Sequence, residues 1–363
     1  MNLILKCGVC LYDERRSFIF DTQYSSYMFR LSVSESLLQF KQPAGTSRGV
    51  YTTREVCYIE ATDETGFVGV GESSPLPDLS CDVVPNYPEL VRSICKDVEA
   101  TQAIDYERLR NYPSVLFGIE TALLHLKHRS TAFFDTPFSR GEQGIRINGL
   151  IWMGTYDEMF ARIKEKLDAG FKCVKLKIGA IDFDRELALI AYIRQHFSAE
   201  VLELRVDANG AFPLDEVDDK LAQLSKYQIH SIEQPIKAGQ WKALGEICAH
   251  TPIPIALDEE LIGVNEKAQK EAMLDTVKPQ YIILKPTLHG GMRGCDEWIS
   301  MAEARNIGWW ATSALESNVG LNAIAQWVAT HNISMPQGLG TGLLFTTNVS
   351  MPLQIVGDCL WRR

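Results

Sequence analysis

Apolar and polar residues alternate with two different periods along this chain of 363 residues. In residues 50–73 the period is two around a turn at 63–66, which predicts a β-hairpin. Apolar residues three and four positions apart follow, and they predict helices at 86–101 and 113–127. The first third of the chain is therefore predicted to form an α+β module.

From about residue 145 the pattern changes to short apolar runs that alternate with amphipathic helical segments. A capping box of Thr155 and Glu158 begins the first of these helices, and the last one is predicted at 319–330. The predicted strands between and before them are 146–151, 172–178, 202–207, 229–233, 254–258, 280–285 and 308–313. Seven or eight such units favour a closed barrel of parallel strands over an open sheet.

The fold class predicted from the two patterns is α/β, with a (β/α)7β barrel and an α+β capping domain. The barrel is assigned residues 131–342 and contains the chemistry described next. The capping domain is assigned residues 1–130, and the C-terminal stretch 343–363 is expected to return to it.

Charged residues close five consecutive predicted strands of the barrel. In chain order they are Lys175 with Lys177, Asp207, Glu233, Asp258 and Lys285. A charge at the end of an apolar strand costs free energy unless it is paired or binds a metal. Because the carboxyl ends of barrel strands meet at the face where such barrels bind substrate, these residues predict an active site there.

The lysines on either side of this site suit proton transfer. Lys175 and Lys177 alternate with apolar residues, so both are expected to point into the barrel mouth, with Lys285 on the opposite side. Neighbouring ammonium groups and partial burial lower a lysine pKa, which makes a lysine a usable base. The pattern therefore suggests proton removal from a carbon beside a metal-bound carboxylate; exposed lysines on an edge strand are the alternative.

Three carboxylates, those of Asp207, Glu233 and Asp258, are expected to converge from successive strands. With no histidine or cysteine among them, they suit Mg²⁺, for which Mn²⁺ can substitute. Asn209 and Glu259 are predicted to support these ligands by hydrogen bonds from behind. The alternative is that each carboxylate is simply paired with a lysine or an arginine.

A substrate site is predicted where the seventh barrel strand ends. Ser313, Ser317 and Asn318 cluster there at the start of a helix, and backbone N–H groups at a helix N-terminus bind anions. Simple capping of the helix by Ser317 is the alternative. Arg205 shares a strand face with Asp207 and is included among the predicted substrate-binding residues.

The composition limits the classes of molecule that this protein is expected to bind. The net charge of −10 argues against nucleic acid and anionic membranes, but it leaves a small dicarboxylate substrate possible. No apolar run is long enough for a membrane span or a signal peptide. Nine scattered cysteines, including Cys7 and Cys10, predict reduced thiols and a cytoplasmic protein.

The motifs around the charged residues resemble those of the enolase superfamily, and within it the muconate-lactonising-enzyme subgroup. VKLKI, VDAN, IEQP, LDE and LKP occur in that subgroup's order and spacing. The runs TSALESNVGLNAIAQWVA, QGLGTGLLFTTN and GTSRGVYTTRE are further similar to the o-succinylbenzoate synthase family. This resemblance implies a barrel enzyme with a capping domain.

The resemblance also implies roles for individual residues. Lys177 would remove the proton α to the carboxylate of 2-succinyl-6-hydroxy-2,4-cyclohexadiene-1-carboxylate and then protonate the departing hydroxyl, a syn dehydration that gives 2-succinylbenzoate for menaquinone biosynthesis. Lys285 would stabilise the enediolate from the other face, and Lys175 would stay charged. The three carboxylates would hold Mg²⁺. The loop at 45–54 would close over the substrate, whose succinyl carboxylate would lie near Ser317.

Some features leave other activities open. Gly210 and Phe212 stand where many such synthases carry Arg and Trp. N-succinylamino-acid racemases and dipeptide epimerases use the same two lysines for 1,1-proton transfer, and muconate cycloisomerisation is a further alternative. The run 337–342 lacks the Asp-x-Asp that is usual in dipeptide epimerases. A catalytically inactive binding module would have lost one of the charged residues, and none is missing; the oligomeric state stays open.

Overall fold

The computed structural model describes residues 28–46, 49–342 and 344–363. Cys7 and Cys10 lie outside the described residues, as do positions 47–48 of the predicted capping loop. In the part of the chain that is described, the cysteines are free thiols. No helix of these residues is long and apolar enough to cross a membrane.

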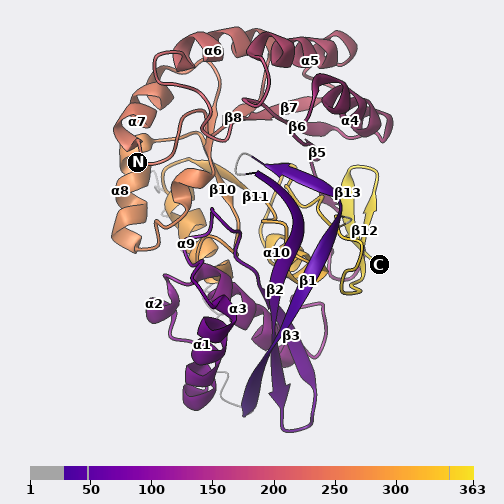
Figure 1. Ribbon diagram of the computed structural model, residues 1–363, viewed down its shortest axis with the longest axis vertical. Coiled ribbons are helices and arrows are strands. Elements are labelled where there is room, and N and C mark those ends of the chain that lie inside the picture. The colour runs from indigo at the N-terminus through magenta and orange to yellow at the C-terminus, as the bar shows by residue number, and fades with distance from the viewer. Residues whose placement is uncertain (1–27, 47–48, 343) are drawn as a thin grey trace, which may run out of the picture.

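The N-terminal part is an antiparallel three-stranded sheet with helices on one face (Figure 1). Its elements are β1 (Phe29–Thr46), β2 (Gly49–Asp63), β3 (Val68–Ser73), α1 (Tyr87–Thr101), α2 (Tyr106–Leu109) and α3 (Pro113–His128). Helix α3 lies directly on β3 because Gly71 has no side chain: a Cβ there would be 1.9 Å from the carbonyl oxygen of Gly118. The predicted hairpin and both predicted helices are therefore present.

Seven parallel strands then form one curled sheet in the order β11-β10-β9-β8-β7-β6-β5. These strands are β5 (Gly149–Ile151), β6 (Cys173–Lys177), β7 (Glu203–Asp207), β8 (Ser231–Glu233), β9 (Ile255–Leu257), β10 (Tyr281–Leu284) and β11 (Gly308–Ala311). The intervening helices are α4 (Tyr156–Asp168), α5 (Phe183–His196), α6 (Val217–Leu224), α7 (Trp241–His250), α8 (Lys267–Val277), α9 (Gly291–Glu303) and α10 (Asn318–Val328). Short 3-10 turns η2 (Ser225–Tyr227) and η3 (Glu259–Leu261) complete this part.

The sheet closes on itself through a short extended segment after α10. Gln337 bridges to Ile147 and Gly338 bridges to Thr312, both in parallel. The Gln337 side chain also accepts a hydrogen bond from the Ala311 N–H at 2.7 Å. This segment takes the place of an eighth strand, so the predicted (β/α)7β barrel is confirmed.

The C-terminal stretch contacts both parts of the molecule. Strand β12 (Leu353–Val356) pairs with β13 (Cys359–Arg362), which pairs with β4 (Ile145–Arg146) at the start of the barrel. The Lys41 N–H of β1 donates to the carbonyl of Leu344 at 2.8 Å. The stretch therefore reaches the capping sheet, while the boundaries at residues 130 and 342 stay predictions.

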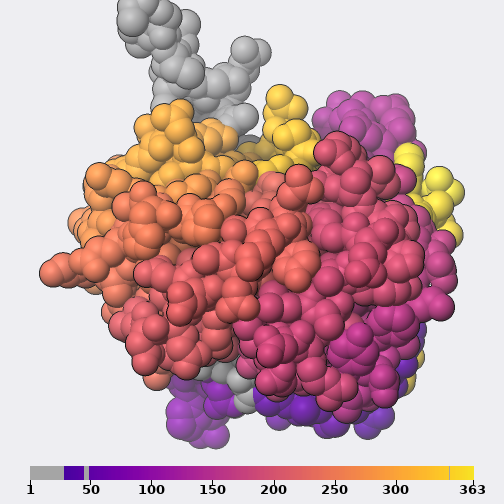
Figure 2. All heavy atoms as spheres, turned by 90° about the horizontal axis from the view of Figure 1, so that it is seen from above, coloured from indigo at the N-terminus to yellow at the C-terminus, as the bar shows by residue number. Residues whose placement is uncertain are grey.

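The capping domain lies against the barrel through α9 and α10, which contact α3 and β3 (Figure 1). An apolar cluster joins the two parts near the barrel mouth, with Tyr58 and Leu76 from one side and Leu288 and Leu315 from the other. Seen at right angles, the segments from α5 to α9 form one broad rounded face, and the indigo N-terminal segments emerge at its lower edge (Figure 2).

Candidate active site

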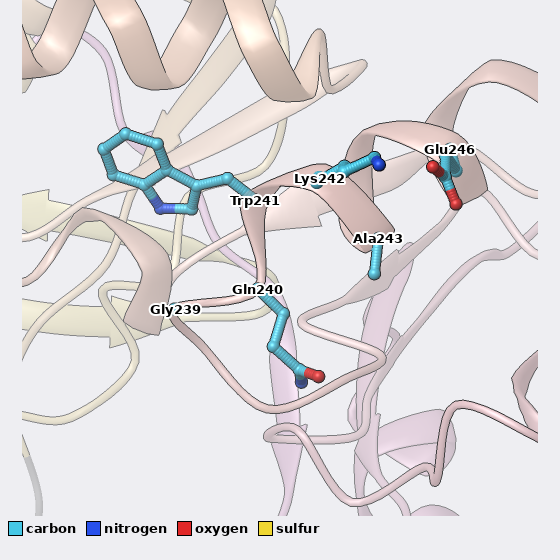
Figure 3. A pocket seen from close by; sticks show the side chains of 6 residues that line it. All are labelled: Gly239, Gln240, Trp241, Lys242, Ala243 and Glu246. Atoms are coloured by element: carbon cyan, nitrogen blue, oxygen red, sulfur yellow. The ribbon is translucent and has the colours of Figure 1, made fainter.

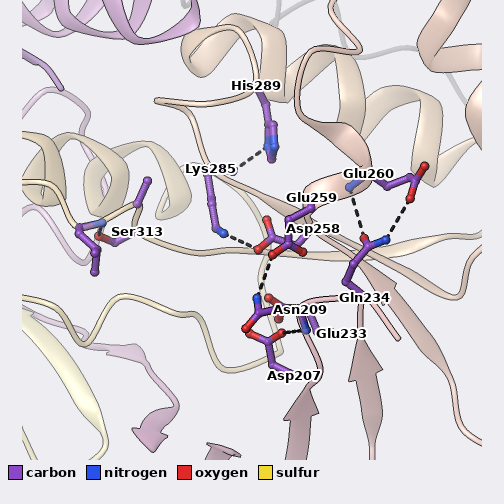
Figure 4. A network of polar contacts seen from close by, with 12 residues as sticks. Asp207, Asn209, Glu233, Gln234, Asp258, Glu259, Glu260, Lys285, His289 and Ser313 are labelled. Carbon is purple, nitrogen blue, oxygen red and sulfur yellow. Dashed lines mark hydrogen bonds and ion pairs between the residues drawn. The ribbon is translucent and has the colours of Figure 1, made fainter. Parts of the chain in front are cut away.

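The predicted charged residues meet at the carboxyl ends of neighbouring strands. The strand register places Lys177 beside Asp207 and Asp207 beside Glu233, so their side chains leave the sheet at one level. These side chains are buried, as are those of Asp258 and Lys285, the first residues after β9 and β10. Figure 4 shows Asp207, Glu233, Asp258 and Lys285 gathered in one region. The structure therefore brings the predicted catalytic and metal-binding residues together.

Ion pairs connect the lysines and carboxylates into one network. The Lys175 Nζ lies 2.9 Å from Asp207 Oδ2 and 2.5 Å from Glu233 Oε2. Lys177 Nζ donates to Asp207 Oδ2 at 2.8 Å. On the other side of the cluster, Lys285 Nζ donates to Asp258 Oδ2. Ammonium groups thus lie on two sides of a central group of carboxylates.

The carboxylates favour the charged form of Lys175 and of Lys285. Burial by itself lowers a lysine pKa, because it removes water from the charged state. At Lys175 the charges of Asp207, Glu233 and Asp258 outweigh burial and raise the pKa above its ordinary value. The same balance, with Asp258 as the main partner, raises the pKa of Lys285. The prediction of a lowered pKa is therefore wrong for Lys175, because it did not include the charges of the neighbouring carboxylates.

The pKa values of Asp207 and Glu233 are shifted in opposite directions. Burial raises the pKa of Asp207, but Lys175 and Lys177 outweigh it and lower that pKa below its ordinary value. At Glu233, burial and the charge of Asp207 together raise the pKa well above its ordinary value. A cation beside Glu233 would therefore favour its ionised form strongly.

Asn209 and Glu259, the two residues predicted to support the site, form hydrogen bonds at the edge of the network. Lys177 Nζ donates to Asn209 Oδ1 at 2.7 Å, and Asn209 Nδ2 donates to Glu259 Oε1 at 2.8 Å. Asn209 adopts a left-handed backbone, φ 44°, which asparagine tolerates better than most residues. The amide therefore orients the Lys177 ammonium, and Glu259 fixes which way the amide faces.

The oxygen atoms of this cluster fit a hard divalent cation. Glu233 Oε1, Asp258 Oδ1 and Glu259 Oε2 are buried and lack a hydrogen-bond partner among the described residues. A buried carboxylate oxygen without a partner is costly, and binding a cation removes that cost. Within the same residues no three acidic, histidine or cysteine side chains are already arranged as a metal cage. The chemistry of these oxygen donors fits Mg²⁺, while the Lys175 ammonium contacts the carboxylates of Asp207 and Glu233.

Ser317 faces the capping domain. Its N–H and Oγ–H both donate to the Glu72 carboxylate, at 2.8 and 2.5 Å, and the Gly320 N–H donates to the same carboxylate at 2.8 Å. Ser317 also caps α10, since its Oγ accepts from the Val319 N–H. The anion at this helix N-terminus is therefore a protein side chain, and the capping alternative describes Ser317.

Ser313 and Asn318 lie in the same loop region with different partners. Ser313 Oγ donates to Glu316 Oε2 at 2.6 Å and accepts from Thr341 at 2.8 Å. Asn318 Nδ2 donates to the Val349 carbonyl at 3.0 Å. Ser313 thus links the end of β11 to the segment that follows the barrel closure, and Asn318 links the start of α10 to the C-terminal stretch.

Arg205 does not join the cluster. Its guanidinium donates to Glu203 at 2.7 Å and to the Pro336 carbonyl at 3.0 Å, and it lies 4.2 Å from the ring centre of Trp310. Arg205 precedes Asp207 by two residues on the same face of β7, so it lies one layer deeper in the barrel. The period of two correctly placed it inside the barrel, but it could not show the direction of its guanidinium.

Gly210 and Phe212, which stand after β7 where many such synthases carry Arg and Trp, both pack against neighbouring segments. A Cβ at Gly210, φ 76°, would lie 2.9 Å from the Cα of Lys237, so a side chain here would strain the loop. Phe212 is buried, and its ring lies 4.9 Å from the Lys220 ammonium. Both positions pack against neighbouring segments of the barrel rim.

Several polar residues of this region were missed by sequence reasoning. They are Glu72, Gln234, Glu260, His289 and Glu316, and all are buried. Gln234 Nε2 donates to Glu260 Oε2 at 2.9 Å, which ties the loops after β8 and β9 together. Gln234 directly follows the predicted ligand Glu233, and Glu260 directly follows the predicted supporting residue Glu259, so their positions were an available signal. No sequence signal pointed to Glu72, because its hydrogen-bond partners lie on a helix almost 250 residues later.

A shallow surface depression beside α7 is a separate feature (Figure 3). It has a volume of about 440 Å³ and is lined by Gly239, Gln240, Trp241, Lys242, Ala243 and Glu246. None of these residues belongs to the lysine and carboxylate network. We therefore place the candidate active site at the strand ends and not in this depression.

Comparison with known proteins agrees with this arrangement. The family described as "Enolase C-terminal domain-like" matches residues 158–352. The o-succinylbenzoate synthase of Desulfotalea psychrophila is 44% identical over 91% of this chain and 98% of its own. The crystal structure of MenC from Desulfotalea psychrophila LSv54 superposes with a TM-score of 0.78 at 40% identity, over 92% of this chain and 99% of that one.

More distant relatives share the fold. The L-Ala-D/L-Glu epimerase of Bacillus subtilis is 24% identical over 84% of this chain and 85% of its own. Its substrate-liganded structure superposes with a TM-score of 0.78 at 21% identity, over 92% of this chain and 96% of that one. The lysine and carboxylate network at the barrel strand ends, the family match and the 44% identity lead to one conclusion: this chain belongs to the enolase superfamily of enzymes.

Proposed function

We propose that this chain is an o-succinylbenzoate synthase, a lyase that dehydrates 2-succinyl-6-hydroxy-2,4-cyclohexadiene-1-carboxylate to 2-succinylbenzoate in menaquinone biosynthesis. The observation that carries the proposal is the placement of Lys177 and Lys285 on opposite sides of one carboxylate cluster. The 44% identity to a synthase over almost the whole of both chains supports the choice of reaction. The cytoplasm is its predicted location.

The carboxylates of Asp207, Glu233 and Asp258 would hold Mg²⁺, which Mn²⁺ can replace. When bound, this cation supplies positive charge for the substrate carboxylate and for the enediolate that forms from it. Glu259 supports the site through Asn209. The unpartnered oxygens of Glu233 and Asp258 support this assignment.

Lys177 moves the proton in the proposed mechanism. Its Nζ would accept the proton from the carbon α to the substrate carboxylate and then donate it to the hydroxyl that leaves as water. Both transfers occur on one face of the ring, which makes the elimination syn. Asn209, whose Oδ1 accepts from Lys177 Nζ at 2.7 Å, would orient Nζ toward that face. The bonds broken are C–H and C–O, and the ring becomes aromatic.

Lys285 and Lys175 act as cations. Lys285 would lie over the other face of the ring and stabilise the enediolate electrostatically. Its raised pKa supports a charged ammonium. Lys175, held by Asp207 and Glu233, would stay charged near the substrate carboxylate.

The second substrate carboxylate is proposed to lie near Ser313 and Asn318, beneath residues 45–54. Residues 45–46 and 49–54 belong to β1 and β2 and not to a loop, and Arg54 of β2 donates to the carbonyl of Ala314 at 3.3 Å, which supports the position of β2 beside this region. Ser317, which binds Glu72, is assigned to docking of the capping domain.

The second candidate is 1,1-proton transfer, as in N-succinylamino-acid racemases and dipeptide epimerases. The epimerase relatives, with 24% identity for that of Bacillus subtilis, support it less than the synthase relative does. The segment 337–342 also lacks an acidic residue for a substrate amino group. Both reactions need Lys177 and Lys285, so only the substrate distinguishes them.

An ultraviolet assay of the purified protein with the cyclohexadiene substrate tests the proposal. Fast aromatisation with Mg²⁺ that EDTA abolishes and Mg²⁺ restores is the expected result. No turnover by folded protein that binds Mg²⁺ would contradict it. Polarimetry with N-succinylamino acids would then test the second candidate.

A further inference from the structure

The turn that follows β10 contains a buried histidine beside Lys285. His289 is 1% exposed and lies four residues after the lysine, in the sequence Lys285-Pro-Thr-Leu-His289. In Figure 4 its ring points back toward the backbone of Lys285, on the side of the turn away from Asp258. No step of the proposed mechanism uses this side chain.

His289 binds both polar backbone groups of Lys285. The Lys285 N–H donates to His289 Nδ1 at 3.0 Å. The Lys285 carbonyl accepts from the His289 N–H at 3.0 Å and from the Leu288 N–H at 2.8 Å. Strand β10 ends at Leu284, whose partner is Ala311, so His289 fixes the backbone at the first residue beyond the strand.

The contacts define the protonation of the ring. Because Nδ1 accepts a hydrogen bond, the ring is neutral and Nε2 carries the proton. Burial agrees with this, since it lowers the pKa of His289 to about 3. Nε2 has no hydrogen-bond partner among the described residues. A buried N–H without a partner reduces stability, so overall stability is a poor explanation for a histidine here.

The other end of the turn is held by the capping domain. Glu120 of α3 accepts hydrogen bonds from the N–H groups of Met292 at 2.6 Å and Arg293 at 3.3 Å, at the start of α9. Gly291 makes room for this, because a Cβ there would lie 2.3 Å from Glu120 Oε2. The turn is thus fixed at both ends, and His289 is the side chain within it that faces Lys285.

We propose that His289 is a positioning residue for Lys285, because its Nδ1 holds the Lys285 N–H and thereby keeps the ammonium beside Asp258. Under the proposed function, on which this inference rests, His289 keeps the cation over the ring face opposite Lys177. The ammonium lies at the end of a four-carbon side chain, so a small rotation of the Lys285 backbone moves it considerably. Misplacing a catalytic group by about 1 Å can cost on the order of 100-fold in rate.

Two substitutions of similar shape separate the hydrogen bond from the packing. In His289→Asn the amide oxygen can take the place of Nδ1, whereas His289→Leu fills the same space without an acceptor. We expect His289→Leu to lower kcat by about 10-fold to 100-fold while KM and Mg²⁺ affinity stay near wild type. His289→Asn should restore most of kcat. His250→Leu, at an exposed histidine of α7, is the control for loss of a histidine and should leave kcat unchanged.

The inference is overturned if His289→Leu keeps wild-type kcat, or if Asn and Leu are equally impaired. Should the Leu variant not fold, Asn and Gln decide the question. Gln carries its oxygen one bond further from the backbone, so an active Asn and an impaired Gln variant support the proposal. The reverse order contradicts it.

Hydrogen exchange of the metal-free protein tests the contact without turnover. In a peptide containing Lys285, the Lys285 amide should exchange faster in His289→Leu than in wild type and should be protected again in His289→Asn. Equal protection in all three proteins contradicts the proposed hydrogen bond. This measurement also separates the two proposals: an inactive wild-type protein with the expected exchange pattern would contradict the synthase assignment and retain the role of His289.

Discussion

Two groups of buried carboxylates lie at the barrel rim, and their partners differ in kind. Asp207, Glu233 and Asp258 at the strand ends face lysine ammonium groups. Glu72 and Glu120 of the capping domain face backbone N–H groups at the starts of α10 and α9. Ammonium groups on long side chains can move when a cation or a substrate binds, whereas backbone N–H groups at a helix start cannot move independently.

This difference in partners separates the carboxylates proposed to act in the reaction from those that attach the capping domain to the barrel. Under the proposed function, the strand-end carboxylates would exchange lysine partners for the cation when it binds. The carboxylates of Glu72 and Glu120 instead occupy helix N-termini that could otherwise bind an anionic ligand. They hold the capping domain on α9 and α10, the two barrel helices that follow β10 and β11. We therefore expect substitutions in the strand-end network to affect turnover, and substitutions at the contacts of Glu72 and Glu120 to affect stability.

The largest effect is expected from the lysines. Lys177→Ala and Lys285→Ala should each lower kcat by about 100-fold to 10,000-fold, because each removes a group that acts in the transition state. The ultraviolet assay measures this, and circular dichroism checks the fold. Lys226→Ala, at an exposed lysine, is the control. Turnover near the wild-type rate in either variant would refute the role of that lysine.

The next effect concerns metal binding. Glu233→Gln should weaken Mg²⁺ binding by at least about tenfold, because it removes a charged oxygen ligand. Isothermal titration of metal-free protein measures this affinity directly. The matched control is Glu246→Gln, at an exposed glutamate of α7. An unchanged titration would remove Glu233 from the ligand set.

The docking contacts should affect stability more than turnover. Ser317→Ala removes a hydrogen bond to the buried Glu72 carboxylate, which is worth about 1.5–3 kcal/mol of unfolding free energy. Denaturant unfolding measures the loss, and the assay should show kcat near wild type. A variant of normal stability with a strongly raised KM would return Ser317 to the substrate site.

A smaller effect is a pH dependence from Glu120. Burial raises the pKa of Glu120 to about 8, so the folded protein holds this proton more tightly than the unfolded chain does. The resulting stabilisation is fully present below about pH 4.3, the ordinary glutamate pKa, and is lost as the pH rises through about 8. Glu120→Gln cannot ionise and lacks this dependence. The difference in melting temperature between wild type and Glu120→Gln should therefore change across this range, and a constant difference would contradict the assignment.

The barrel and its charged rim could be predicted because their signals are local. Side chains alternate along a strand, so Lys175 and Lys177 had to share a face, and Asp207 had to lie at the same level on the next strand. The capping box of Thr155 and Glu158 is another local signal, and it is present in the structure. In each case the residues that interact are close in sequence or are related by the repeat of one strand and one helix.

The remaining features depend on residues that only the folded chain brings together. Ser317 meets Glu72 across 245 residues, and Met292 meets Glu120 across 172. No periodicity connects such positions, so the sequence could not show that a protein carboxylate would occupy the start of α10. By itself the sequence determined which side chains enter the barrel mouth, because the strand period sets their direction. The tertiary structure decided which partners those side chains have, because packing of the capping domain on the barrel brings distant groups into contact.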